Sequence, residues 1–73
     1  MATFWVSPDV DKWRLQREGS YRAERICATR SEAIDWGCRL AMVHAPAVVK
    51  VQDYGGTITT QFEFGRAVVQ AAE

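Results

Sequence analysis

The serines and the histidine are the residues from which a nucleophilic or acid–base site would have to be built. The chain has Ser7, Ser20 and Ser31, and His44 is its one histidine. A serine nucleophile needs a base within hydrogen-bond reach and an acid behind that base, and no spacing among these residues implies such an arrangement. His44 is expected at the end of a helix, where the helix dipole favours its charged form. The sequence therefore predicts a protein without enzymatic activity.

Cys27 and Cys38 are the residues that could bind a soft metal, with His44 as a third ligand. On a helix, Cys38 and His44 would lie about 240° apart around the axis, so their side chains would diverge. Two cysteines are also too few for a disulfide scaffold. We expect two reduced, partly buried thiols, with no metal and no cofactor.

Aromatic and basic residues form a second group, of a kind that binds nucleic acid. The chain has nine basic and nine acidic residues, but between Lys12 and Arg30 six basic residues stand against two acidic ones. An exposed tryptophan could stack on a base while cations contact phosphates. The candidate residues for this surface are Trp5, Lys12, Arg14, Arg22 and Lys50. The alternative is a solvated sheet face whose arginines and glutamates form cross-strand pairs.

Trp36 is a large aromatic residue among charged neighbours of the expected helix. It lies about 120° from the centre of the apolar stripe of that helix, with Val43 two turns further along the same line. We interpret Trp36, Arg39 and Val43 as a candidate protein-binding surface, because a partly exposed tryptophan is an effective binding anchor. The alternative is that the C-terminal tail covers Trp36 with Val68 and Val69.

The elements that would position these residues follow from alternation and capping. Strands are expected over 3–7, 12–18, 21–28, 47–52 and 57–64. Thr29 and Glu32 form a capping box that begins a helix, and Pro46 predicts its end near His44. The stripe expected to face the sheet consists of Ala33, Ile34, Gly37, Leu40, Ala41 and His44.

The sequence thus predicts one α+β domain over residues 1–65. A single helix packs on one face of a mainly antiparallel, four- to five-stranded sheet, in the order β-β-β-α-β-β. Residues 66–73 are expected to be a tail, either a short helix or an added edge segment, that packs against the domain or is free to bind. The strand order along the sheet stays open.

The chain resembles a family of small bacterial and phage proteins, domain of unknown function 2188. The resemblance covers residues 4 to 64 in order, and the matching residues are Trp5-Val-Ser-Pro8, Trp13 with Leu15, Glu18-Gly19, Arg22-Ala23, Thr29 with Glu32-Ala33-Ile34, Leu40-Ala41, Val49 with Val51, and Gly56 with Ile58. It implies a fold and no catalytic residues.

A second resemblance covers residues 12–41. A strand with a tryptophan, a basic strand and a helix that opens with Thr-x-x-Glu-Ala are similar to the arm-site DNA-binding domains of tyrosine integrases. Those domains place a three-stranded sheet against DNA. The resemblance implies a DNA-binding sheet, although Glu18 and Glu24 interrupt its basic character.

A small domain without catalytic groups is expected to act by binding. No stretch is apolar and long enough to span a bilayer, so we expect a cytoplasmic monomer or homodimer without a membrane partner. The resemblance to phage proteins suggests a protein partner. The narrower expectation is an inhibitor of the anti-CRISPR kind, which would bind a host nucleic-acid-handling complex and block it. Nucleic-acid binding through the open sheet face is the alternative function.

Overall fold

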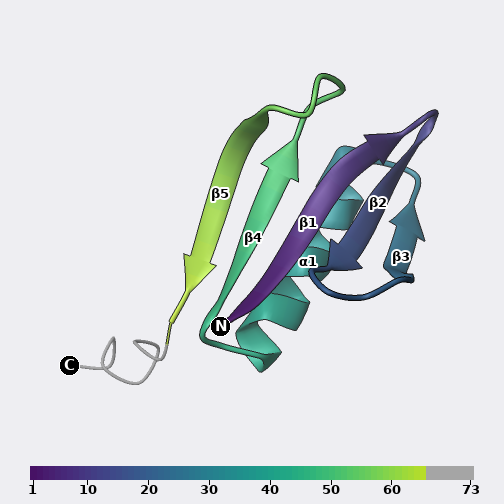
Figure 1. Cartoon of the computed structure of the whole chain (residues 1–73). Helices are drawn as coiled ribbons and strands as arrows, with labels where there is room; N and C mark the ends of the chain where they lie inside the picture. Colours follow the sequence, from purple (N-terminus) through teal and green to yellow (C-terminus); the bar gives the residue numbers. More distant parts are fainter. Residues whose placement is uncertain (66–73) are drawn as a thin grey trace.

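The computed structural model describes residues 1–65 and shows one helix on one face of a five-stranded sheet (Figure 1). The α+β prediction is confirmed. The sheet order is β3-β2-β1-β4-β5. The elements, in chain order, are β1 (Ala2–Asp9), β2 (Lys12–Arg17), β3 (Ala23–Cys27), α1 (Arg30–Val43), β4 (Ala47–Gln52) and β5 (Ile58–Phe64).

The helix decides where the second part of the chain joins the sheet. The first three strands form an antiparallel meander, and α1 then carries the chain back so that β4 lies beside β1 and parallel to it. A parallel pair needs a long crossover of this kind, which a tight turn cannot supply. β5 returns antiparallel to β4 and ends the sheet. The first strand of the chain therefore lies in the middle of the sheet.

The core lies between the sheet and α1. Alternation along the strands turns Phe4, Val6, Leu15, Val49 and Val51 toward the helix, and all five side chains are buried. Gly37 lets the helix come close, because a Cβ at that position would lie 3.1 Å from Leu15 Cδ1 and 3.3 Å from Val49 Cγ1. Ala33 and Ala41 are buried on either side of it. Small residues on the helix thus allow larger ones on the strands.

The ends of α1 lie where the sequence predicts them. The backbone N–H of Glu32 donates to Thr29 Oγ1 at 3.1 Å, as in a capping box. The Glu32 carboxylate accepts instead from the N–H of Ala28, at 3.3 Å, so the return bond is one residue earlier than predicted. His44 caps the other end, and its N–H donates to the Leu40 carbonyl. Its side chain is exposed, but its ring lies 6.1 Å from that of Phe4 on β1, so His44 faces the sheet, as predicted for the stripe, without being buried.

The third strand starts later than predicted. Ser20 Oγ contacts both the N–H and the carbonyl of Arg22 and holds this segment in a turn, so β3 begins at Ala23. A bulge follows, because Gln16 pairs with Ala23 while Leu15 pairs with Arg25. Arg25 consequently lies on the helix side of the sheet, with Leu15. The predicted tail, 66–73, lies outside the described residues.

Candidate interaction surfaces

Trp5 lies on the sheet face that α1 leaves open. It pairs with Gln16 on β2 and with Lys50 on β4. The Lys50 Nζ lies 5.1 Å from the centroid of the indole, and the indole Nε1–H donates to Glu18 Oε1 at 3.0 Å. Trp5 is half-buried, and both its ring and its N–H have partners within the chain.

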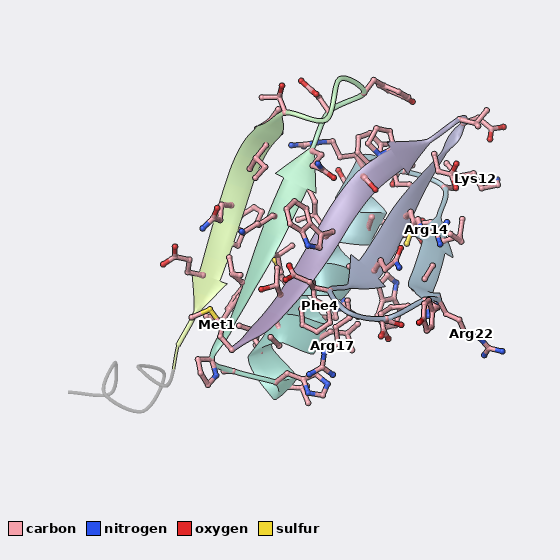
Figure 2. The ribbon with its side chains drawn as sticks, in the orientation of Figure 1. Met1, Phe4, Lys12, Arg14, Arg17 and Arg22 are labelled. Carbon is pink, nitrogen blue, oxygen red and sulfur yellow. The ribbon has the colours of Figure 1, made fainter. Side chains whose placement is uncertain are left out.

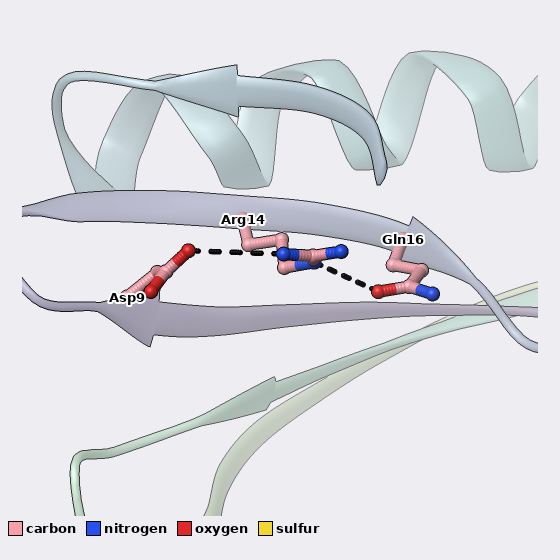
Figure 3. Close-up of polar contacts among 3 residues, drawn as sticks. All are labelled: Asp9, Arg14 and Gln16. Carbon is pink, nitrogen blue, oxygen red and sulfur yellow. Dashed lines mark hydrogen bonds and ion pairs between the residues drawn. The ribbon is translucent and has the colours of Figure 1, made fainter. Parts of the chain in front are cut away.

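Arg14 lies on the same face and is also engaged. Its Nε donates to Gln16 Oε1 at 2.8 Å, and its Nη1 lies 3.7 Å from Asp9 Oδ2 across the β1–β2 hairpin (Figure 3). These contacts match the alternative in which charged side chains on the open face pair with one another. Such a partly exposed pair contributes little to stability, but it holds the guanidinium in place.

The two remaining cations of the predicted nucleic-acid surface lie far from each other. Figure 2 shows Lys12 at the start of β2 and Arg22 in the turn before β3, at the opposite end of these strands. Both are exposed. Arg22 does not lie in a strand, so its predicted place on the open face was wrong; the Ser20 turn removes it. The structure brings Trp5, Arg14 and Lys50 onto one face and leaves Arg22 outside.

The open face carries charges of both signs. Lys12, Arg14 and Lys50 are accompanied by the carboxylates of three other residues, Asp9, Glu18 and Glu63. A hollow of about 340 Å³ lies where β4 begins and β5 ends. It is lined by both Lys50 and Glu63, together with Thr3, Val48 and Gln61. Positive charge therefore does not accumulate on this face, which weakens its suitability for phosphates.

Trp36 lies on the flank of α1 that points toward β3. It is half-buried and packs against the core. The guanidinium carbon of Arg25 lies 3.9 Å from the centroid of the indole, and that of Arg39 lies at 5.3 Å. Both distances are within the range of cation–π contacts. A tryptophan among charged residues is thus stabilised by the core beneath it and by two arginines.

The surface around Trp36 combines these arginines with exposed apolar groups. Arg39 is held by Asp35, at 2.9 Å one helical turn earlier. Val43, at the end of the helix, is 77% exposed. We define the Trp36 surface as Arg25, Trp36, Arg39 and Val43. The sequence pointed to the last three and missed Arg25, although the alternation of β3 places Arg25 on the same side as Cys27.

The two thiols are free and protonated at neutral pH. Burial is the main cause that raises the pKa of Cys27; the Glu32 carboxylate adds to it and Arg25 acts in the opposite direction. Burial, followed by Asp35, raises the pKa of Cys38. Thiols of this kind are poor nucleophiles. Within residues 1–65, no three His, Cys, Asp or Glu side chains lie close enough to hold a metal ion, and no helix is long and apolar enough to cross a membrane.

Comparison with known proteins identifies a family. The model of a family described as "Uncharacterized protein conserved in bacteria (DUF2188)" matches residues 4–63. No curated protein and no solved structure matches the chain. The resemblance of residues 12–41 to integrase arm-site domains stays a prediction. The match covers both the meander and the β4–β5 hairpin, and the chain belongs to the DUF2188 family.

Proposed function

We propose that this protein is a non-enzymatic protein-binding module whose interface is the Trp36 surface. The observation that carries the proposal is the half-buried indole of Trp36, with Arg25 at 3.9 Å and Arg39 at 5.3 Å. Tryptophan and arginine are the residue types that most often dominate binding energies. Here these side chains are already held in place, so they would lose less conformational entropy when a partner binds.

The chemistry of the Trp36 surface defines the kind of partner that fits it. Val43 offers an exposed apolar contact further along α1, at the end of the helix. Arg39 has one carboxylate partner, Asp35, and its guanidinium has further N–H groups for a second. The complementary surface is an apolar protein patch with a carboxylate at its rim. The narrower hypothesis, an inhibitor of a host nucleic-acid-handling complex of the anti-CRISPR type, predicts that this patch belongs to a subunit of such a complex.

Photo-cross-linking followed by reconstitution tests the proposal. A benzophenone amino acid at position 43 should capture a protein in cells, whereas the same group at position 12, on the open face, should not. The captured protein is then purified, and its binding is measured by calorimetry. Trp36→Ala should weaken the affinity about 30-fold, since truncation of such an anchor costs about 2 kcal/mol. Arg39→Glu, which reverses a charge on the surface of the helix, should also weaken the affinity.

Two results would contradict the proposal. One is capture from position 12 and not from position 43. The other is full affinity in both the Trp36→Ala and Arg39→Glu variants, with circular dichroism showing that each variant is folded. Arg22→Ala is the control, because Arg22 lies in the turn before β3 and outside the Trp36 surface.

Nucleic-acid binding through the open face is the second candidate, and the Trp5–Lys50 contact at 5.1 Å is the observation that favours it. Fluorescence anisotropy with labelled single-stranded and duplex DNA and RNA tests it. Binding that falls steeply with salt and is lost in an Arg14→Ala, Lys50→Ala double variant would support this candidate. Because Arg22 lies off the sheet, Arg22→Ala should leave such binding unchanged. No binding at low salt would remove the candidate.

A further inference from the structure

Two arginines on the helix side of the sheet lie without an acidic partner. Arg17 ends β2 and pairs with Phe4 on β1, while Arg25 on β3 pairs with Leu15 on β2. Phe4 and Leu15 are buried under α1, so both arginines lie on the side of the sheet that the helix covers. Among residues 1–65 neither guanidinium forms an ion pair, not even with Glu24, the chain neighbour of Arg25. Two like charges thus share this side of the sheet without carboxylates that would balance them.

Both guanidinium groups are held over aromatic rings. The guanidinium carbon of Arg25 lies 3.9 Å from the centroid of Trp36, and that of Arg17 lies 5.8 Å from the centroid of Phe4. Figure 2 labels Arg17 and Phe4 near the end of β2. These are cation–π distances, and such a contact uses the face of the guanidinium. The N–H groups lie in the plane of the guanidinium and point outward from its edge, where an acceptor can reach them.

Arg17 extends the Trp36 surface toward the end of the helix. The ring of Phe4, over which Arg17 lies, is 6.1 Å from the ring of His44. His44 caps α1 directly after Val43, so Arg17 lies near the end of the helix that carries Val43. The Trp36 surface and Arg17 therefore form one continuous region along α1 and the strands beside it.

Cations outnumber carboxylates in this region. Among residues 1–65, the one ion pair that Arg17, Arg25 or Arg39 forms is that of Arg39 with Asp35, at 2.9 Å. Three arginines less one aspartate leave an excess of two positive charges, or of one when Glu24 is also counted. Charge of one sign attracts a partner of the other sign and speeds its association. The region is therefore complementary to an anionic partner, whereas the open face carries charges of both signs.

We infer that the segment bound at the Trp36 surface is an acidic stretch of polypeptide whose carboxylates pair with Arg17 and Arg25. The inference rests on the proposed function, because it names the class of partner for the same surface. A carboxylate accepts two parallel N–H bonds from one guanidinium. An arginine that already lies over a ring loses less freedom when it forms them.

A nucleic acid also carries negative charge, and the surroundings of Trp36 distinguish the two classes of partner. A base of a single strand stacks on an open aromatic face. The indole of Trp36 packs against the core and has Arg25 over its ring at 3.9 Å, so that face is already covered. Val43, 77% exposed in the same region, can be buried by an apolar side chain of a polypeptide but not by a phosphate backbone. An acidic polypeptide is the better match.

Fluorescence anisotropy with the full chain tests the inference. The probe is a fluorescein-labelled synthetic peptide that repeats Glu-Glu-Leu, and its neutral control repeats Gln-Gln-Leu. The glutamate peptide should bind at low salt and the glutamine peptide should not. Arg17→Ala and Arg25→Ala should each weaken binding about fivefold, the upper end of the range for exposed ion pairs. Lys12→Ala, which removes a cation at the opposite end of β2, is the matched control and should leave binding unchanged.

A charge swap gives a second measurement. The double variant Arg17→Glu, Arg25→Glu should lose the glutamate peptide and bind a peptide that repeats Lys-Lys-Leu, because the signs are then exchanged on both sides. Circular dichroism shows whether each variant is folded. A folded double variant that still binds the glutamate peptide would overturn the inference.

Three other results would also overturn it. They are no binding of the glutamate peptide at low salt, full affinity in both alanine variants, and tighter binding of a labelled oligothymidylate that depends on the same two arginines. These results are separate from a failure of the proposed function. A protein captured from position 43 that needs Trp36 but neither Arg17 nor Arg25 would keep the interface and remove the acidic partner. Peptide binding through these arginines, with capture from position 12 alone, would do the reverse.

Discussion

The two edge strands of the sheet are built in opposite ways. β3 has five residues, a bulge, and the charges of Glu24 and Arg25. Its Arg25 reaches back over Trp36, so this edge is tied to the helix. β5 has seven residues, a bulge at Thr59 and one charge, and the helix touches it least. The difference teaches that two edges that both carry a bulge can still be anchored differently: charges and a cation–π contact tie β3 to the helix, whereas β5 is held mainly by its pairing with β4.

The two halves of the sheet also differ in how their hairpins turn. The β1–β2 turn places Val10 at φ 62°, a conformation that β-branched residues rarely adopt. The Tyr54 hydroxyl donates to the Val10 carbonyl at 3.1 Å. The β4–β5 turn uses Gly56 at φ 87°, and Asp53 Oδ1 accepts from the N–H groups of Gly55 and Thr57. The β1–β2 turn is held by a hydrogen bond from Tyr54, which lies outside that turn. The β4–β5 turn has a glycine at the position where its backbone needs a positive φ.

The largest expected effect compares two aliphatic residues of similar size, Leu15 under the helix and Ile58 on β5. Leu15→Ala should lower the free energy of unfolding by about 3 kcal/mol, because the side chain is fully buried and its loss leaves a cavity. Ile58→Ala should cost about 1 kcal/mol, since much of that side chain is already exposed. Urea unfolding measures both. Equal costs would mean that the Ile58 side chain is as well packed as that of Leu15, contrary to its exposure.

The turns should respond in opposite directions. Val10→Asn should raise the free energy of unfolding by about 1 kcal/mol, since asparagine tolerates the left-handed region and the backbone bond from Tyr54 is kept. Gly56→Ala should lower it by about 1 kcal/mol, although a Cβ there meets no atom within 4 Å. Thermal and urea unfolding give both values. Val10→Thr, which keeps the branched side chain, is the control and should change little.

Removing the contact that ties β3 to the helix should have a smaller effect. Arg25→Ala should lower the free energy of unfolding by about 0.5–1 kcal/mol, the usual range for a cation–π contact at an exposed site. In a Trp36→Leu background the same substitution should cost nothing measurable, which a double-mutant cycle would show. Arg22→Ala serves as the control. A full cost in the Trp36→Leu background would mean that Arg25 stabilises β3 by another route.

The smallest effect concerns the thiols. Burial raises the pKa of Cys27 and Cys38 above the ordinary value of 9.0, so the folded chain holds these protons more tightly than the unfolded chain does. The resulting stability is fully present below pH 9.0 and is lost as the pH rises through the folded pKa values. Urea unfolding at pH 8 and pH 10 should show a decrease, and a Cys27→Ala, Cys38→Ala variant should show a smaller one. An equal decrease in both proteins would assign it to other groups.

Local rules predicted much of this fold. Thr29 and Glu32 marked the start of α1, and alternation identified all five strands, because capping and strand burial act between residues close in sequence. The pairing of β1 with β4 was not predictable in this way, since it depends on which strand the helix crossover reaches.

The candidate surfaces were predictable only in part. Trp36, Arg39 and Val43 follow from helical spacing, whereas Arg25 comes from β3, and its place over Trp36 depends on how α1 packs against that strand. Arg22 was wrongly placed because a serine side chain competes with the strand for the backbone of that segment. Bulges and side-chain turns depend on tertiary packing, which strand alternation does not describe.

The central position of β1 has a consequence for synthesis. Ala2 pairs with Ala47, and Val6 with Val51, so β1 leaves the ribosome well before its parallel neighbour is synthesised. Contacts this far apart in sequence carry a loop-closure cost that must be met before they stabilise anything. The meander alone leaves one side of β1 unpaired, and its apolar residues are exposed meanwhile to other nascent chains. β1 is therefore synthesised early, but it becomes a central strand of the sheet only once β4 has followed.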